Sequence, residues 1–395
     1  MSRERRPLTE VTRPQPNAGS KSAELSALLE NHRGERHAIV MQDYPDPDAI
    51  SSAWAHKMIA ARFGVECDII YEGRISHQEN LALVQLTDLD LVRYEGGDLS
   101  HYSGTVFVDN QGTTSRLTER FEALGIKPLV IVDHHEQQDL ISPEFLDLRH
   151  IGATATIYTE YIRDGLLELS KGDPEHVKLA TALTHGIRSE TSGLVRGHAE
   201  ELEAATFLSR FADSSLLEDI LSVKRSKQVM DVIREALENR EIRESYSISG
   251  VGLLRSEDRD AIPQAADFLM TEENIHTAIV YGIIIKGDRE MVIGSMRTDK
   301  VTLNPDEFLK EALGATETGR YYGGGRRGAG GFEIPIGFLA GIKDDDDLVR
   351  MKWRLYHQLI KKKLLEKIGA HPPIRTESPR ESAPVTTGPL RPEEA

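Results

Sequence analysis

Short apolar runs alternate with segments of helical spacing through the first half of the chain. Residues 38–41, 105–108 and 129–132 are rich in Val and Ile and have the length of buried parallel strands. Between them, residues 49–60 and 74–86 show the apolar spacing of helices. This alternation predicts an α/β fold whose N-terminal part is a doubly wound parallel sheet.

Chemically active side chains follow three of these predicted strands. They are Asp46 and Asp48 after the first strand, Asp109 after the second, and Asp133, His134 and His135 after the third. Since the carboxyl ends of parallel strands meet at one edge of a sheet, we expect these side chains to converge.

Several carboxylates at one edge repel one another, and a divalent cation is the simplest way to hold them together. Oxygen and imidazole donors suit manganese, zinc or iron better than calcium, and the absence of thiols argues against a closed structural zinc site. A single Asp after a strand is more often a helix cap, and residues 45–48 alone fit a turn. Three such clusters in order favour the metal site.

Two segments add candidate ligands and phosphate contacts. The predicted helix at 49–60 begins beside the acidic cluster, where free N–H groups favour phosphate. Residues 152–156 begin another helix with small side chains, which fits either a close approach of backbone to phosphate or tight helix packing. Further on, Glu190 is a candidate ligand, His185 a weaker one, and Arg188 a candidate phosphate contact.

The pattern changes from about residue 246, where strand-like runs at 251–254, 276–285 and 290–297 predict a smaller C-terminal α/β domain. The last two runs flank a predicted hairpin turn. Residues 323–331 are rich in glycine and contain Arg326 and Arg327. We expect a loop whose N–H groups and guanidinium groups bind phosphate, since a flexible linker would carry more serine.

The composition limits the function further. A net charge of −16 argues against a broadly basic nucleic-acid platform but allows a local basic pocket. One cysteine, Cys67, excludes an intramolecular disulfide and fits a reducing compartment. No apolar stretch approaches the length of a membrane span, and the N-terminus lacks the apolar core of a signal peptide. We therefore expect a cytoplasmic protein without a membrane partner.

Five motifs together resemble the DHH phosphoesterase superfamily with its associated C-terminal domain, especially the RecJ-related nanoRNase and phosphoadenosine-phosphate phosphatase branch. In chain order they are residues 45–50, 108–109, 133–135, 186–191, and 323–325 with 329–330. The resemblance covers residues 36 to 341 and implies an active site in the cleft between two domains.

The resemblance also implies roles for individual residues. Two Mn²⁺ ions, with Mg²⁺ or Co²⁺ as substitutes, would be held by Asp46 on one side and by Asp48 and His134 on the other, with Asp109 bridging them. Asp133 would support the site and His135 would face the substrate. On the C-terminal domain, the substrate phosphate would be bound by Arg297, Gly323, Gly324, Gly325, Arg326 and Arg327.

Three positions depart from the family pattern. Gln42 stands where the family has a metal-binding histidine, Glu190 where it has aspartate, and Arg326 where it has histidine. Glutamate still ligates metals and arginine still binds phosphate. Glutamine is a poor ligand for a transition metal, so the first metal site is weakened unless Asp43 substitutes.

The resulting hypothesis is hydrolysis of short oligonucleotides (nanoRNA, pApA) or of a nucleoside 3′,5′-bisphosphate by a water activated between two metal ions. Cyclic di-AMP, pyrophosphate and polyphosphate are alternative substrates, although residues 323–331 argue against pyrophosphate. A nucleotide-binding regulatory protein with an impaired metal site is an alternative of another class. The expected partner is a small nucleotide or short single-stranded oligonucleotide, and the sequence is compatible with a homodimer.

The expected domain organisation follows from these patterns. It comprises a disordered leader at 1–22, a DHH catalytic domain at 23–200, a helical connector at 201–245, a substrate-binding domain at 246–342, a C-terminal helix at 343–370 and a disordered tail at 371–395.

Overall fold

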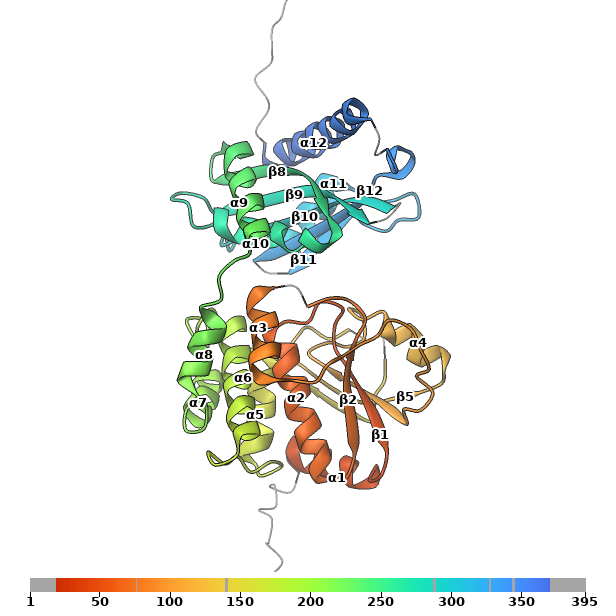
Figure 1. The fold of residues 1–395 in the computed structure, drawn as a ribbon, viewed down its shortest axis with the longest axis vertical. Coiled ribbons are helices and arrows are strands. Elements are labelled where there is room, and N and C mark those ends of the chain that lie inside the picture. The colour runs from red at the N-terminus through yellow and green to blue at the C-terminus, as the bar shows by residue number, and fades with distance from the viewer. Residues whose placement is uncertain are drawn as a thin grey trace, which may run out of the picture. The chain divides into compact units, whose positions relative to one another are not determined.

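The structure is a computed structural model that describes residues 19–75, 77–138, 141–286, 289–326, 328–342 and 345–369. Most of the expected leader and all of the expected tail lie outside these residues. The chain divides between Arg225 and Ser226 into two compact units (Figure 1), which we describe separately.

The first unit contains a six-stranded sheet in the order β3-β2-β1-β4-β5-β6, and every neighbouring pair is parallel. The strands are β1 (Arg36–Val40), β2 (Glu66–Tyr71), β3 (Val92–Arg93), β4 (Gly104–Val108), β5 (Lys127–Asp133) and β6 (Phe145–Leu148). The predicted doubly wound parallel sheet is therefore confirmed.

Helices cover both faces of this sheet, which explains the unbroken apolar runs. Ile39 and Val108 belong to the core under α2, α5 and α6, whereas Val40 and Phe107 belong to the core under α4. The helices of this unit are α1 (Lys21–Asn31), α2 (Pro47–Arg62), α3 (Gln78–Thr87), α4 (Leu117–Ala123), α5 (Thr154–Arg163), α6 (Pro174–Glu190), α7 (Ala199–Leu208) and α8 (Ser214–Leu221).

Helix α6 passes very close to the first turn of α2, and Gly186 makes this approach feasible. A Cβ atom at Gly186 would lie 2.5 Å from Ser51 Oγ, 3.1 Å from the Pro47 carbonyl oxygen and 3.2 Å from Asp48 Cα. A side chain at this position would therefore push α6 away from the segment that carries Asp48.

The second unit has a mixed sheet in the order β11-β12-β10-β9-β8-β7, in which only β8 and β9 pair in parallel. The strands are β7 (Glu241–Arg243), β8 (Tyr246–Arg255), β9 (Thr277–Lys286), β10 (Arg289–Thr298), β11 (Gly323–Arg326) and β12 (Ala329–Pro335). The strands β9 and β10 confirm the predicted hairpin, although residues 287–288 of its turn lie outside the described part.

Helices also cover both faces of the second sheet. One face packs against α9 (Lys227–Asn239) and α10 (Ala261–Leu269), and the other against α11 (Pro305–Leu313) and α12 (Asp346–Ile368). Two short 3₁₀ turns, η1 (Ser256–Asp258) and η2 (Gly337–Leu339), complete the unit. This is the predicted smaller α/β domain.

The glycine-rich segment is not the loop that its composition predicts. It forms the antiparallel strands β11 and β12, with Gly324 paired to Gly331 and Gly325 to Gly330. Packing restricts side chains here, because a Cβ atom at Gly330 would lie 2.8 Å from Leu309 of α11, and one at Gly323 would lie 3.0 Å from Leu309 and from Phe332.

The expected helical connector at 201–245 is divided between the units. Leu208 of α7 and Ile220 of α8 belong to the first unit's core, whereas Val232 and Ile233 of α9 pack under the second sheet. Among the described residues, no helix has both the length and the apolar character that a membrane crossing requires.

The contact at Gly186 gives the first prediction. Alanine normally stabilises a helix interior by about 1 kcal/mol relative to glycine, but the clash with Ser51 and Pro47 should reverse the sign. We expect Gly186→Ala to lower the free energy of unfolding by about 1 to 3 kcal/mol in urea denaturation. Gly172→Ala is the control, because its Cβ atom would approach Ser170 Oγ only to 3.6 Å. Equal stability of the two variants would contradict this account of Gly186.

Candidate active site

The adjacent strands β1, β4 and β5 end at one edge of the first sheet. Val40 lies level with Phe107, and Val108 lies level with Val132, so the residues that follow these strands are neighbours in space. The chain order reverses between β1 and β4, which is where open α/β sheets place ligands. The topology thus brings the three predicted clusters together.

The Asp48 carboxylate is completely buried and is held by the start of α5. It accepts hydrogen bonds from the backbone N–H groups of Thr154 and Ala155, both at 2.7 Å, and from Ser52 Oγ at 3.3 Å. The small residues at the start of α5 therefore let its N-terminus bind a carboxylate of the chain itself.

Asp109 sits beside Asp48 in an unusual backbone conformation. Its φ of 58° lies in the left-handed region, which aspartate and asparagine tolerate better than most residues. The side chain is 2% exposed, and one oxygen accepts a hydrogen bond of 3.0 Å from Thr154 Oγ1. Thr154 thus contacts both buried carboxylates.

His134 presents one ring nitrogen to these carboxylates. Its Nδ1 lies 3.0 Å from the Ile151 carbonyl oxygen and donates to it, which leaves the lone pair on Nε2. Nε2 lies 3.5 Å from an Asp109 oxygen and 3.8 Å from an Asp48 oxygen. It is buried and has no hydrogen-bond partner in the described part of the chain. An imidazole oriented by a carbonyl in this way is typical of metal ligands.

Asp133 holds the second histidine of the pair. It accepts hydrogen bonds from His135 Nδ1 at 2.7 Å, from the His134 N–H at 2.8 Å and from Gln111 Nε2 at 2.8 Å. Burial by itself raises the pKa of Asp133, but the hydrogen bonds from His135 and Gln111 outweigh it, and the pKa is lowered. His135 Nδ1 also lies 3.8 Å from Asp109.

Asp46 caps helix α2 and also belongs to the cluster. One oxygen accepts the Ala49 N–H at 3.0 Å, and the other accepts Gln42 Nε2 at 3.1 Å. Asp43 pairs with Arg116 Nε at 2.5 Å, so the structure does not support Asp43 as a replacement ligand.

The pKa values of the clustered carboxylates show that their negative charge is not balanced by nearby positive charge. Burial, followed by the charge of Asp46, raises the pKa of Asp48 to about 7. Burial and the charges of Asp48 and Asp46 raise the pKa of Asp109 well above its ordinary value, and Glu190 at the end of α6 contributes. A divalent cation would remove this penalty, and the donor set of carboxylate oxygens and an imidazole nitrogen fits one. Asp109, His134 and His135 each direct a donor atom within 4.8 Å of the others.

Residues 37–187 match the model of the DHH family, N-terminal domain. This part of the chain is a DHH-family domain.

Three similar proteins extend the comparison. Uncharacterized protein MJ1633 of Methanocaldococcus jannaschii is 36% identical over 328 residues, which are 82% of this chain and 62% of the relative's length. The structure of an exopolyphosphatase-related protein from Bacteroides fragilis matches with a TM-score of 0.62 at 15% identity, covering 87% of this chain and 98% of that one. The latter match shows a shared fold. RecJ from Thermus thermophilus, solved with Mn²⁺, matches with a TM-score of only 0.43 at 14% identity, covering 88% of this chain and 56% of that one.

His185 and Arg188 lie in the last turns of α6. The Nε atom of Arg188 is buried without a hydrogen-bond partner among the described residues. His185 is 1% exposed, and burial, with the charges of Arg188 and His77, lowers its pKa to about 4.

The expected phosphate-binding residues of the second unit lie in and beside its sheet. Arg297 on β10 donates from Nε to Asp267 at 2.6 Å and from a terminal nitrogen to Ser295 Oγ at 2.9 Å. The Gly325 N–H donates to the Asp306 carboxylate at 3.2 Å. The side chain of Arg326 and the whole of Arg327 lie outside the described part.

The sequence did not identify three residues that orient the DHH site. Thr154 donates hydrogen bonds to both Asp48 and Asp109. The Ile151 carbonyl oxygen accepts from His134, and Gln111 donates to Asp133. The small residues at the start of α5 predicted a close approach of the backbone to phosphate or tight helix packing. The group that Thr154 binds there, the Asp48 carboxylate, is 106 positions away in the sequence. A pattern of local spacing cannot reveal that pairing.

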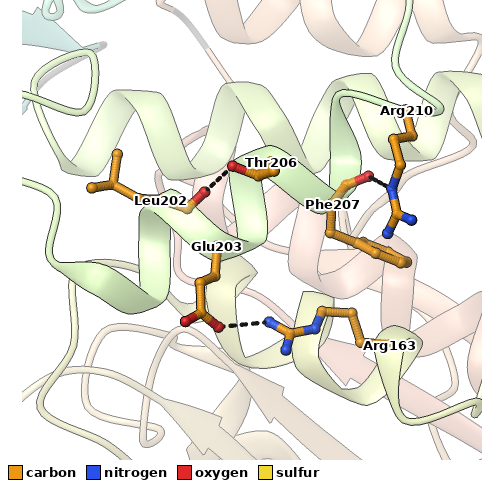
Figure 2. A pocket seen from close by; sticks show the side chains of 6 residues that line it. All are labelled: Arg163, Leu202, Glu203, Thr206, Phe207 and Arg210. Carbon is orange, nitrogen blue, oxygen red and sulfur yellow. Dashed lines mark hydrogen bonds and ion pairs between the residues drawn. The ribbon is translucent and has the colours of Figure 1, made fainter.

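A surface hollow of about 410 Å³ lies elsewhere on the first unit (Figure 2). It is lined by Arg163, Leu202, Glu203, Thr206, Phe207 and Arg210. Arg163 pairs with Glu203 at 3.3 Å, and Arg210 lies over the Phe207 ring. The hollow contains none of the clustered carboxylates, so we do not assign the chemistry to it.

The raised pKa values predict how the stability of the metal-free protein depends on pH. The folded state binds protons on Asp48 and Asp109 more tightly than the unfolded chain, so this contribution is present below pH 3.8 and is lost as the pH rises through about 7. We expect the melting temperature in EDTA to fall over this window, with a shallower fall in Asp109→Asn. The exposed Asp219→Asn serves as the control, and identical slopes in all three proteins would contradict the assignment.

Proposed function

We propose that the protein is a divalent-metal-dependent phosphoesterase that acts on short nucleotide substrates, either oligonucleotides such as pApA or a nucleoside 3′,5′-bisphosphate. One observation carries the proposal: the buried and unpartnered Nε2 atom of His134 faces the carboxylates of Asp48 and Asp109. Hydrolysis of phosphoesters is one of the reactions for which such mixed carboxylate and imidazole metal sites are used.

The proposed metal ligands divide into two groups. Asp48, His134 and Asp109 would hold one Mn²⁺ ion, and Asp46, Asp109, Glu190 and Gln42 would surround the other. When bound, the ions would supply an activated water and stabilise the charge that develops on phosphorus. Mg²⁺ and Co²⁺ are expected substitutes.

The chain's own residues would position this chemistry. The two N–H groups at the start of α5 keep Asp48 in one orientation, and the hydroxyl of Thr154 does the same for Asp109. Asp133 accepts a hydrogen bond from His135 Nδ1, which fixes the orientation of the ring. We assign His135 the transfer of a proton to the leaving oxygen, because its side chain is 30% exposed and so accessible to substrate.

The preference for short substrates rests on charge. A net charge of −16 repels a long polyanion, whereas a short substrate needs only a few local cations. We propose Arg188, Arg297, Arg326 and Arg327, with the backbone of Gly323, Gly324 and Gly325, for this task. Cyclic di-AMP and polyphosphate remain the alternative substrates, the latter because a protein of the same fold is described as exopolyphosphatase-related.

Hydrolysis assays test the proposal directly. We expect Mn²⁺-dependent release of mononucleotide or phosphate from one member of a panel of pApA, a nucleoside 3′,5′-bisphosphate, cyclic di-AMP and polyphosphate, and none in EDTA. Asp109→Asn should lower the rate at least about a hundredfold, because several kcal/mol of charge stabilisation depend on the metal site. His135→Gln should lower kcat by about 10² to 10⁴.

The folding of the Asp109→Asn and His135→Gln variants can be checked independently of their activity. Asparagine tolerates the left-handed backbone at position 109, and circular dichroism will report whether each variant is folded. The exposed His101→Gln is the matched control and should keep the wild-type rate. An Asp109→Asn variant that retains most of the activity would contradict the proposed mechanism.

A second function is favoured by one observation. The Gln42 amide donates to Asp46, where the family has a metal-binding histidine, so Asp46 is engaged by an amide that binds transition metals poorly. A chain that loses one ion for this reason would bind a nucleotide without hydrolysing it and would act as a regulatory protein.

Substitution of Gln42 separates the two functions. We expect Gln42→His to lower the Mn²⁺ concentration for half-maximal hydrolysis, because an imidazole replaces the amide beside Asp46. The exposed Gln85→His should leave that concentration unchanged. If the wild type binds at most one ion without turnover, and Gln42→His gains a second ion together with activity, the regulatory function is the correct one.

A further inference from the structure

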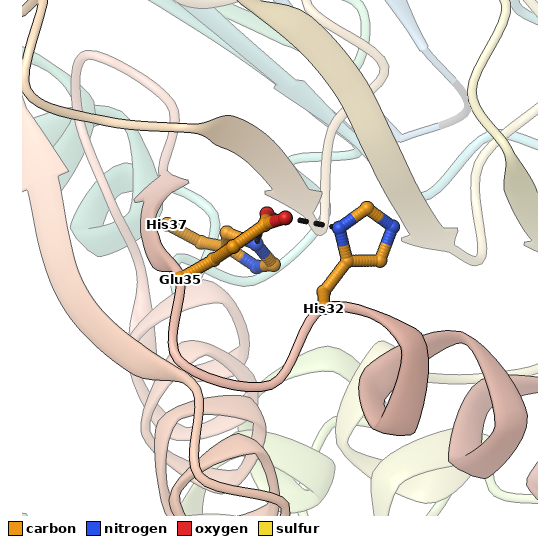
Figure 3. Close-up of side chains that lie close together, drawn as sticks. All are labelled: His32, Glu35 and His37. Atoms are coloured by element: carbon orange, nitrogen blue, oxygen red, sulfur yellow. Dashed lines mark hydrogen bonds and ion pairs between the residues drawn. The ribbon is translucent and has the colours of Figure 1, made fainter.

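A second group of metal-binding side chains lies at the opposite end of β1 from the DHH site. Glu35 precedes the strand, His37 is its second residue, and His32 caps the C-terminus of α1 (Figure 3). The DHH site follows the other end of this five-residue strand, about 17 Å away at about 3.3 Å per residue. The two groups are therefore separate.

The three side chains direct their donor atoms at one point. Glu35 Oε2 lies 2.9 Å from His32 Nδ1 and 3.0 Å from His37 Nε2. Figure 3 shows the carboxylate between the two rings. Ligands of a tetrahedral ion with bonds of about 2.0 Å are roughly 3.3 Å apart, and both distances from Glu35 are within a few tenths of an ångström of this value. All three donor atoms lie within 4.8 Å of one another, so a small inward movement of the rings would admit an ion.

A neighbouring carboxylate lies beside one of these ligands, His32, whereas the outer nitrogen of His37, Nδ1, is buried without a hydrogen-bond partner among the described residues. His32 Nε2 lies 3.5 Å from a Glu144 oxygen, so the ring nitrogen that points away from the cluster faces a carboxylate. At hydrogen-bond distance, a carboxylate in this position would hold His32 in the tautomer that leaves Nδ1 free to bind an ion. The turn is also rigid, since the Glu35 N–H donates to the His32 carbonyl oxygen and the Gly34 N–H to that of Gly64.

The site is open to solvent on one side only, at Glu35. The His37 side chain is fully buried and that of His32 is 17% exposed, whereas the Glu35 side chain is 36% exposed. An ion can therefore enter beside Glu35 and keep a water molecule as its fourth ligand.

We propose that His32, Glu35 and His37 form a zinc site, distinct from the DHH site, that fastens the end of α1 to the start of β1. Two imidazoles and a carboxylate are an established zinc donor set. The affinity order of divalent metals places Zn²⁺ well above Mn²⁺ at such nitrogen ligands, so the two sites differ in their metal. The ion would add stability because a preformed site exists only in the folded chain.

Zinc binding by the whole 395-residue chain tests this proposal. The parent protein carries Asp109→Asn and His134→Gln, which disable the DHH site, and Zn²⁺ affinity is measured by competition with a chromophoric chelator. We expect one tightly bound Zn²⁺ per chain and a higher melting temperature with Zn²⁺ than in EDTA. Added Co²⁺ should give the visible absorption of a tetrahedral ion.

Variants in this parent decide the ligands. Glu144→Gln should weaken Zn²⁺ binding about tenfold as an outer partner, and His32→Gln or Glu35→Gln should weaken it by more than a hundredfold. The exposed His101→Gln should leave it unchanged, and melting in EDTA reports whether each variant is folded. Absence of zinc binding by the parent, or unchanged affinity in both His32→Gln and Glu35→Gln, would overturn the proposal and leave an ordinary ion-paired turn.

Discussion

The site depends on the hydrogen bonds by which the N-terminus of helix α5 holds the Asp48 carboxylate. Two backbone N–H groups at 2.7 Å hold a side chain that is removed completely from water. The same helix start supplies the Thr154 hydroxyl to Asp109. The close approach of α6 at Gly186 fixes the first turn of α2, on which Asp48 lies. Three helices thus position one carboxylate before any metal is considered.

This arrangement concentrates negative charge where the protein gains nothing from it in the absence of a cation. Carboxylates are rarely found in a protein interior unless they are paired, for example with arginine. Asp48 and Asp109 are buried and instead face the unprotonated nitrogen of His134. The raised pKa values of both carboxylates express the same cost in another form. A cation bound at this end of the DHH-family domain would offset that cost.

The sequence predicted those features of the site that follow from the parallel order of the strands. The apolar runs before Asp46, Asp109 and Asp133 are buried on both faces of the sheet, so they read clearly as strands, and their carboxyl ends must meet. Contacts between distant segments were not predictable. The glycines at 323–325 indicated a loop because composition does not distinguish turn glycines from those in a closely packed strand, such as Gly323 against Leu309 and Phe332. Likewise, nothing near Thr154 in the chain points to Asp48 or Asp109.

The most direct test of the central claim is a crystal structure of the protein grown with Mn²⁺, with anomalous diffraction recorded at the manganese edge. The account predicts anomalous density bounded by Asp48, Asp109 and His134 Nε2, with a second peak beside Asp46 where occupancy permits. Density confined to other parts of the molecule, with His134 Nε2 still unpartnered, would contradict it.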